Sequence, residues 1–320
     1  MHTLLSACYL RLTVFARSRH PDGFVQGGRT VAMRYYRVAT DQGTTLVARD
    51  DEKAYDLTGA RDGLRDFCDL ARIADVVDTD VDGVTERLTA DAPLLDAHSV
   101  TERAILPALP GEVWAAGVTY EVSSDAREEE SSRGEIYQGV FEGDRPEVFF
   151  KATPSRTVGP GESVGIREDS EWDVPEPELG VVVYREEIVG YTVGNDMSSR
   201  SIEGENPLYL PQAKVYDRCC AIGPCIASPA TVGDPRDLEL SMTIERDGET
   251  LFDDSTSTSK LVRSPEELVS YTTRHNPLPE LAVVLTGTSL VPEEFTLEAD
   301  DHVAIEIENV GRLENQVVTV

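Results

Sequence analysis

Two glutamates stand at alternate positions where an apolar run begins, in the stretch WDVPEPELGVVV at 172–183. In a β-strand, side chains two positions apart lie on one face with their α-carbons about 6.5–7 Å apart, so Glu176 and Glu178 point the same way. Pro175 and Pro177 lack backbone donors, which places this stretch on a sheet edge or at the entry to a strand. Two carboxylates that face one hollow raise each other's pKa unless a cation lies between them, and a divalent ion resolves that conflict.

A third carboxylate, Asp196, ends the next apolar run, in EEIVGYTVGNDMSSR at 186–200, after a return of hairpin length. Three oxygen ligands without cysteine or histidine suit a hard, octahedral ion such as Mg²⁺ or Mn²⁺. About three coordination positions then remain, and two neighbouring ones can take the carboxylate and keto oxygens of a 2-oxo acid. The alternative is that Glu176 and Glu178 form a solvated strand face, which is the common role of glutamate pairs in a chain as acidic as this one.

The elements that must position these carboxylates are short strands. From residue 113 onward, β-branched runs alternate with Gly, Pro and Asp turns at a period that is mostly two, with one helix expected at 264–275. This pattern predicts a β-rich α+β protein with a catalytic domain over 111–320, sandwich-like or rolled, rather than a doubly wound sheet.

The preceding part of the chain reads as a smaller unit. Apolar patterns predict strands at 33–40 and 44–59 and a helix at 64–77. The Pro- and Gly-rich LPALPGE at 106–112 then indicates a boundary. We therefore expect a small N-terminal α+β domain over 33–110.

Charge and composition disfavour several kinds of partner. The 320 residues hold 59 acidic and 29 basic side chains, a net charge of −30 that repels phosphate backbones. No window approaches the roughly 18–20 continuous apolar residues of a membrane helix. Five cysteines, an odd number without framework spacing, indicate a reducing, cytoplasmic location. We therefore expect neither a nucleic-acid nor a membrane partner.

The distribution of charge suggests the setting in which the protein works. Acidic residues are spread along the chain and lysines are few, which suits a surface kept hydrated in a very salty cytoplasm. We expect a halophilic source, the alternative being an ordinary acidic cytosolic enzyme. Residues 1–32 differ because they are basic, and we expect them to be a leader, disordered or preceding the native start, with Met33 opening the folded part.

Six short pieces of the chain follow one another in an order that is typical of one family. They are GVTY at 117–120, FFKATPS at 149–155, EPELGVVV at 176–183, GYTVGNDMSSR at 190–200, LTGT at 285–288 and the closing DDHVAIEIENVGRLENQV at 300–317. The third and fourth pieces together make a specific signature. On these motifs the chain from 113 to 320, about two thirds of its length, resembles the fumarylacetoacetate hydrolase family.

This resemblance implies a fumarylacetoacetase-like, mixed β-roll catalytic domain in a homodimer or higher homo-oligomer. It implies that Mg²⁺ or Mn²⁺ is held by Glu176, Glu178 and Asp196. It also implies that five residues lie at a small-molecule 2-oxo acid substrate: Lys151, Arg200, Lys214, Thr286 and Thr288. Lys151, the lysine of FFKATPS, would lie near the ion, and the turn that holds the two threonines would bind the substrate carboxylate. Read alone, Arg200 could be a surface ion-pair partner and Lys214 a solvated lysine.

One departure from the family pattern bears on the reaction. Hydrolytic members usually carry a histidine three residues after the tyrosine of the Gly-x-x-Tyr piece, where this chain has Ser123. Serine without a base is a poor activator of water, so carbon–carbon bond hydrolysis is disfavoured. The stretch SSDAREEESS at 123–132, which includes Arg127, and Glu147 just ahead of Lys151 resemble the sugar-acid dehydratase branch, the 2-dehydro-3-deoxy-pentonate dehydratases.

The resemblance to this branch implies a hydro-lyase. It would dehydrate a 2-keto-3-deoxy-pentonate, of the arabinonate or xylonate type, to 2,5-dioxopentanoate in pentose degradation. Ser123 and Arg127 are then expected to contact the substrate, and Lys214 and Glu147 to act as base and acid, in an order that the sequence leaves open. Two alternatives stay open: an acylpyruvate- or fumarylpyruvate-type hydrolase or an oxaloacetate decarboxylase on the same metal site, and a catalytically silent binding module.

Overall fold

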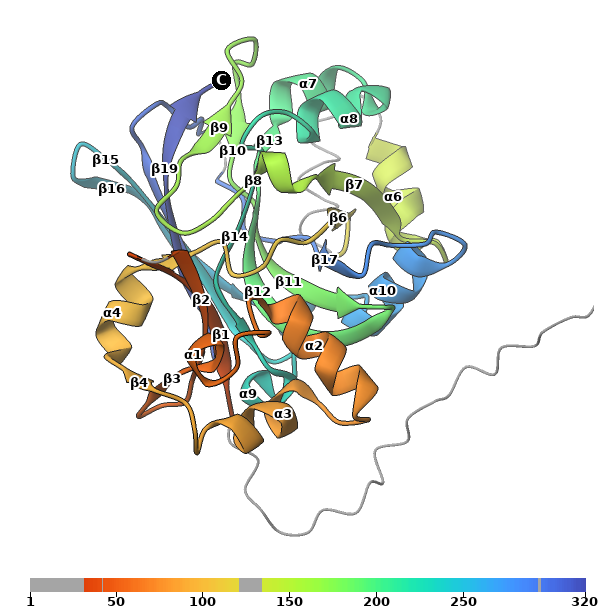
Figure 1. Cartoon of the computed structure of the whole chain (residues 1–320). Coiled ribbons are helices and arrows are strands. Elements are labelled where there is room, and N and C mark those ends of the chain that lie inside the picture. The colour runs from red at the N-terminus through yellow and green to blue at the C-terminus, as the bar shows by residue number, and fades with distance from the viewer. Residues whose placement is uncertain (1–31, 42, 121–133, 293–294) are drawn as a thin grey trace, which may run out of the picture.

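A mixed sheet of twelve strands forms the centre of the computed structural model, which describes residues 32–41, 43–120, 134–292 and 295–320 (Figure 1). Its strands, in chain order, are β1 (Arg34–Thr40), β2 (Gly43–Arg49), β3 (Ala54–Asp56), β4 (Leu94–Leu95), β5 (Ala104–Ile105), β6 (Glu112–Gly117), β7 (Glu147–Ala152), β8 (Thr157–Val158), β11 (Pro177–Tyr184), β12 (Glu187–Asp196), β14 (Cys220–Ala227) and β17 (Leu281–Leu285). Their order across the sheet is β4-β3-β2-β1-β14-β12-β11-β17-β6-β7, with β5 also paired to β1 and β8 to β14. The β17–β6 and β14–β8 pairs are parallel.

A second sheet of five strands packs against the first. Its order is β16 (Glu249–Ser257), β15 (Glu239–Arg246), β18 (His302–Ile307), β19 (Gly311–Thr319) and β9 (Val164–Ile166), and β10 (Asp173–Val174) pairs separately with β13 (Ser198–Ser199). Buried and exposed residues alternate along β15 and β19, because only one face of each strand is turned to the core. Apolar side chains of both sheets, among them Val193, Leu240 and Ile305, belong to one buried cluster.

Short helices cover the ends and edges of the sheets. They are α1 (Leu57–Ala60), α2 (Phe67–Val76), α3 (Val81–Leu88), α4 (Ala97–Glu102), α6 (Gly134–Glu142), α7 (Arg200–Glu205), α8 (Leu210–Lys214), α9 (Pro229–Val232) and α10 (Pro265–Thr273), with 3₁₀ turns η1 (Pro154–Arg156), η2 (Pro207–Tyr209) and η3 (Thr258–Lys260). Side chains cap several of them: Asp66 accepts the N–H of the third residue of α2, and Ser264 does the same for α10. The helices expected at 64–77 and 264–275 are thus present in slightly shorter form. None of the helices in the described part of the chain is long and apolar enough to span a membrane.

The β11–β12 hairpin is the element that determines where the site forms. Every residue of β11 is buried, as its continuous apolar run predicts for a strand covered on both faces. Arg185 and Glu186 adopt positive φ in the two-residue turn that joins the strands. The entry to β11 therefore faces the end of β12, with Pro177 opposite Asn195. The expectation of a strand entry is confirmed, whereas an edge position is not, because β11 lies between β12 and β17.

The N-terminal strands extend the same sheet. Arg34 and Tyr35 of β1 pair with Ala227 and Ile226 of β14, so the sheet is continuous across the expected boundary near residue 110. In Figure 1 these N-terminal elements, red to yellow, lie along one side, and α6, α7 and α8 lie toward the other end. The β-rich α+β class expected from the sequence is confirmed. The division into two domains stays a prediction.

Candidate active site

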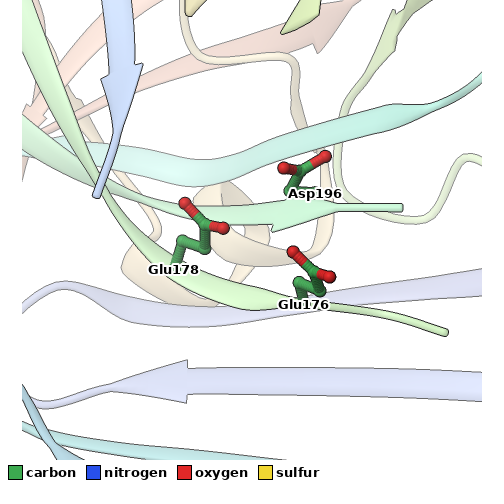
Figure 2. A group of neighbouring side chains, drawn as sticks. All are labelled: Glu176, Glu178 and Asp196. Atoms are coloured by element: carbon green, nitrogen blue, oxygen red, sulfur yellow. The ribbon is translucent and has the colours of Figure 1, made fainter. Parts of the chain in front are cut away.

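The three carboxylates expected to bind a metal meet at one end of the β11–β12 hairpin (Figure 2). Glu176 immediately precedes β11, Glu178 is its second residue and Asp196 is the last residue of β12. The antiparallel pairing continues to this point, since the backbone N–H of Asp196 donates to the carbonyl of Glu176 at 2.9 Å. One oxygen from each carboxylate lies within 4.8 Å of the others, and the exposed fractions of the residues are only 3 %, 1 % and 1 %.

Crowding of negative charge defines the electrostatics of this cluster. Burial, and then the charges of Asp196 and Glu176, raise the pKa of Glu178 well above its usual range. Burial and the charge of Glu178 likewise raise the pKa of Tyr120. A cation at the shared centre relieves such repulsion. The donors are hard carboxylate oxygens without thiolate or imidazole, so the residues fit Mg²⁺ or Mn²⁺.

Two cationic side chains from α7 and α8 contact the carboxylates. Lys214 Nζ, at the end of α8, donates to Glu176 Oε2 at 2.7 Å and to Asp196 Oδ2 at 3.2 Å, and it also contacts Ser198 Oγ. Arg200 Nη2, at the start of α7, lies 3.0 Å from Glu176 Oε1. Both cations are buried. Neither is the solvated surface residue that each could have been when read alone.

A second buried lysine, Lys151 of β7, reaches the same cluster from another side. Its Nζ lies 2.5 Å from Asp196 Oδ1 and donates to the backbone carbonyls of Met197 at 2.7 Å and Lys214 at 2.5 Å. Burial disfavours the charged form, but Asp196 and the neighbouring thiols together hold the pKa of Lys151 above its usual range. Two hydrogen bonds to backbone carbonyls and an ion pair with Asp196 therefore surround the Lys151 ammonium.

The face of β7 that carries Lys151 also carries Glu147 and Phe149, because these residues are two apart. Lys214 Nζ lies 5.6 Å from the centre of the Phe149 ring. Glu147 stands opposite Gly117 of β6, and its carboxylate lies directly over that glycine. Glu147, the half-buried Phe149 ring and the two lysines therefore lie on one side of β7.

The turn Thr286-Gly287-Thr288 follows β17 and completes the wall beside Glu178. Gly287 has a φ of +86°, and its N–H donates to Glu178 Oε2 at 2.6 Å. A Cβ at Gly287 would lie 2.1 Å from Thr119 Oγ1, so both conformation and space require glycine there. The buried Thr286 hydroxyl has no hydrogen-bond partner among the described residues, whereas Thr288 Oγ1 accepts a backbone N–H two residues on.

The outcome for the other expected residues is mixed. Ser123 and Arg127 lie outside the described residues. Conversely, the sequence interpretation did not anticipate Ser198, which contacts Lys214, or Phe149. Alternation along a strand was the signal for Phe149, which stands midway between Glu147 and Lys151 in β7. No such signal marks Ser198, because it lies in β13, after the end of β12 and before the start of α7.

Comparison with known proteins assigns the fold to a family. Residues 113–318 match the family model described as fumarylacetoacetate (FAA) hydrolase, C-terminal. The chain therefore belongs to the fumarylacetoacetate hydrolase family.

Individual relatives point to one branch of that family. The chain is 62% identical over 289 residues to the probable 2-keto-3-deoxyxylonate dehydratase of Haloferax volcanii, a match covering 90% of this chain and 100% of that protein. It is 43% identical over 227 residues to the 2-dehydro-3-deoxy-D-arabinonate dehydratase of Saccharolobus solfataricus, covering 69% and 76% of the two chains. A solved structure of 2-keto-3-deoxy-D-arabinonate dehydratase complexed with magnesium and 2,5-dioxopentanoate matches with a TM-score of 0.77 and 34% identity, over 90% of this chain and 99% of that one. The expected likeness to the dehydratase branch is confirmed.

Proposed function

We propose that this chain is a Mg²⁺-dependent hydro-lyase that converts a 2-keto-3-deoxy-pentonate into 2,5-dioxopentanoate. One observation carries the proposal. Three buried carboxylates converge beside Lys214, in a chain that is 62% and 43% identical to two proteins named as dehydratases of 2-keto-3-deoxy-pentonates. Glu176, Glu178 and Asp196 would hold the ion, each through a carboxylate oxygen. When bound, the ion would polarise the 2-keto oxygen of the substrate and so acidify the protons on C3.

The residues around this centre divide the chemistry between them. We assign removal of a C3 proton to the Lys214 amine, because its Nζ lies among the carboxylates. We assign protonation of the departing C4 hydroxyl to Glu147, which lies farther along the same side of β7. Loss of that hydroxyl as water leaves a double bond between C3 and C4. Moving one proton from C5 to C3 and the C5 hydroxyl proton to C4 then gives the aldehyde without further change in composition.

Other side chains would bind and shield the substrate. The Thr286 hydroxyl and the Arg200 guanidinium would bind the substrate carboxylate, and the Phe149 ring would give an apolar surface beside the Lys214 amine. An apolar surface suits the C3 methylene of a deoxy acid and keeps bulk water from the carbanion that forms there. Ser123 and Arg127 are further proposed substrate contacts, on the resemblance alone.

Stereochemistry bears on what the substrate can be. A 2-keto-3-deoxy-pentonate has one stereocentre, C4, since the parent sugar acid loses the centres at C2 and C3. Acids derived from D-xylose and D-arabinose are consequently the same compound, because those sugars share their C4 configuration. The relevant distinction is between the two C4 enantiomers.

The setting of the enzyme is also a proposal. A net charge of −30 and four free cysteines among the described residues support a cytoplasmic enzyme that works at high salt. The family resemblance supports a homodimer or higher homo-oligomer. The reaction would serve the degradation of pentoses.

Product identification tests the function directly. The purified protein with Mg²⁺ is incubated with each enantiomer of 2-keto-3-deoxy-pentonate, with an acylpyruvate and with oxaloacetate, and products are identified by NMR. We expect 2,5-dioxopentanoate from one pentonate enantiomer and no cleavage of the acylpyruvate, because serine replaces the histidine of the hydrolases. Cleavage of the acylpyruvate or decarboxylation of oxaloacetate, without dehydration of either pentonate, would assign the site to one of the alternative reactions.

A further inference from the structure

Each of the three site carboxylates has one oxygen in contact with an ion-pair or hydrogen-bond partner of its own. Arg200 forms an ion pair with Glu176 at 3.0 Å, Lys151 forms one with Asp196 at 2.5 Å, and the Gly287 N–H donates a hydrogen bond to Glu178 at 2.6 Å. The remaining oxygens of Glu176 and Asp196 meet at Lys214 Nζ. In Glu176 and Asp196, one oxygen thus contacts the orienting cation and the other contacts Lys214 Nζ.

Lys151 contacts three separate parts of the site. Besides Asp196 it holds the carbonyl of Met197, the residue that follows the end of β12, and the carbonyl of Lys214 at the end of α8. It is fully buried. The same ammonium therefore connects the strand that carries a carboxylate to the helix that carries the proposed base.

We propose that Lys151 is a positioning residue, which orients Asp196 toward the metal ion and holds the Lys214 backbone in register with it, and that it does not bind substrate. This inference rests on the proposed function of the site. Groups that hydrogen-bond to a metal ligand set its orientation, and their loss typically weakens metal affinity or activity by about 10–100-fold. Removal of Lys151 should impair metal binding and turnover together, because it touches both parts.

Two substitutions test this role. Lys151→Met removes the ammonium at similar length, and Lys151→Gln keeps a shorter side chain with two amide protons. In both variants we expect the Mn²⁺ dissociation constant of the substrate-free protein, measured by electron paramagnetic resonance, to rise about 10–100-fold. We expect kcat for dehydration to fall by a similar factor while KM, at saturating metal, changes by less than about two-fold, since no substrate contact is lost. Lys260→Met, at an exposed position on η3, is the matched control.

The results separate the competing roles of Lys151. An unchanged Mn²⁺ dissociation constant in a folded variant overturns the proposal, as does a rise in KM without loss of metal affinity, which would make Lys151 a substrate contact. The metal titration needs no turnover, so it remains decisive even if no pentonate is dehydrated.

Lysine labelling of the unaltered protein gives an answer that does not depend on the folding of a variant. The chain has four lysines, Lys53, Lys151, Lys214 and Lys260. Reductive methylation followed by peptide mass mapping should modify the exposed Lys53 and Lys260 and leave Lys151 unmodified, with or without Mg²⁺ and pyruvate as a 2-oxo acid probe. Methylation of Lys151 in the free protein, with protection by pyruvate, would contradict the inference.

Discussion

Gly117 leaves room for the Glu147 carboxylate, and any side chain in its place would not. A Cβ on Gly117 would lie 2.0 Å from Glu147 Oε2 and 2.8 Å from Glu147 Cδ. The carboxyl group must then swing away from its present position. A substitution at Gly117 can thus move the carboxyl group of Glu147, the proposed acid, while Glu147 itself is kept.

Gly117→Ala should therefore abolish most dehydration while sparing the earlier proton transfer. General acid catalysis contributes about 10²–10⁴-fold, so we expect kcat to fall by about 100-fold or more. Exchange of the C3 protons with D₂O, followed by NMR, should continue because Lys214 is undisturbed. Gly63→Ala is the control, because nothing lies within 4 Å of a Cβ at Gly63. Loss of C3 exchange together with dehydration would instead identify Glu147 as the base.

At the scale of residues, the sequence predicted the groups with a local pattern. Glu176 and Glu178 stand two apart in one strand, and their convergence follows from side-chain alternation alone. The three oxygen atoms around the Lys151 ammonium come from two other segments of the chain, and no local spacing indicates where a buried ammonium will find its partners. The resemblance placed that lysine near the ion, but it did not indicate the two backbone carbonyls to which the ammonium donates.

At the scale of elements, α3 is fastened to the sheet through a buried acid. Asp82, in the first turn of α3, accepts a hydrogen bond from Tyr35 Oη of β1 at 2.7 Å and another from Ser228 at the start of α9. Tyr35 Oη also lies 3.0 Å from Thr85 Oγ1. Only 2 % of Asp82 is exposed, and burial raises its pKa from the usual 3.8 to about 6 despite both hydrogen bonds.

Because of this raised pKa, we predict that the contribution of Asp82 to the free energy of unfolding depends on pH. Between pH 4 and 6 the folded protein holds a proton on Asp82 that the unfolded chain has lost, so this residue's contribution to stability falls as pH rises through that window. At about 1.4 kcal/mol per unit the full effect is about 3 kcal/mol. Asp82→Asn keeps the hydrogen-bonding shape without the charge, so its free energy of unfolding relative to wild type should rise by about 2–3 kcal/mol from pH 4 to pH 7.

Denaturant unfolding at several pH values checks this expectation. Asp62→Asn is the control, because Asp62 is exposed and its substitution should show no such pH-dependent difference. A difference between Asp82→Asn and wild type that stays constant from pH 4 to pH 7 would contradict the explanation.

The elements themselves were largely predictable, because their signals are local. The apolar run of β11 indicated a strand buried on both faces, and helix caps such as Asp66 and Ser264 mark where α2 and α10 begin. The docking of α3 was not predictable, since Tyr35, Asp82 and Ser228 come from three distant segments that only the folded sheet brings together.

At the scale of the whole molecule, the N-terminal part and the catalytic part are joined by more than a linker. Beyond the β1–β14 pairing, Arg72 of α2 forms two hydrogen bonds with Glu280, at 3.2 and 2.7 Å, and Tyr184 and Arg185 of the β11–β12 hairpin bind the same carboxylate. Hydrogen bonds from Arg72 and Tyr184 lower the pKa of Glu280 to about 2. The Pro- and Gly-rich stretch at 106–112 suggested a boundary, but composition does not report pairing between strands that are distant in the chain.

The central claim is that three convergent carboxylates bind a divalent ion on which dehydration depends. The most direct test is a Mn²⁺ titration by electron paramagnetic resonance of wild type, Glu178→Gln and Glu249→Gln, with product formation measured on the same samples. Glu178→Gln keeps the size of the side chain, so we predict that the variant stays folded. We predict that it binds Mn²⁺ more than about 100-fold more weakly, a larger loss of affinity than that caused by removing a group that only contacts a ligand, and that it forms no 2,5-dioxopentanoate. The control at exposed Glu249 should match wild type. Unchanged Mn²⁺ affinity and normal turnover in Glu178→Gln would contradict the account.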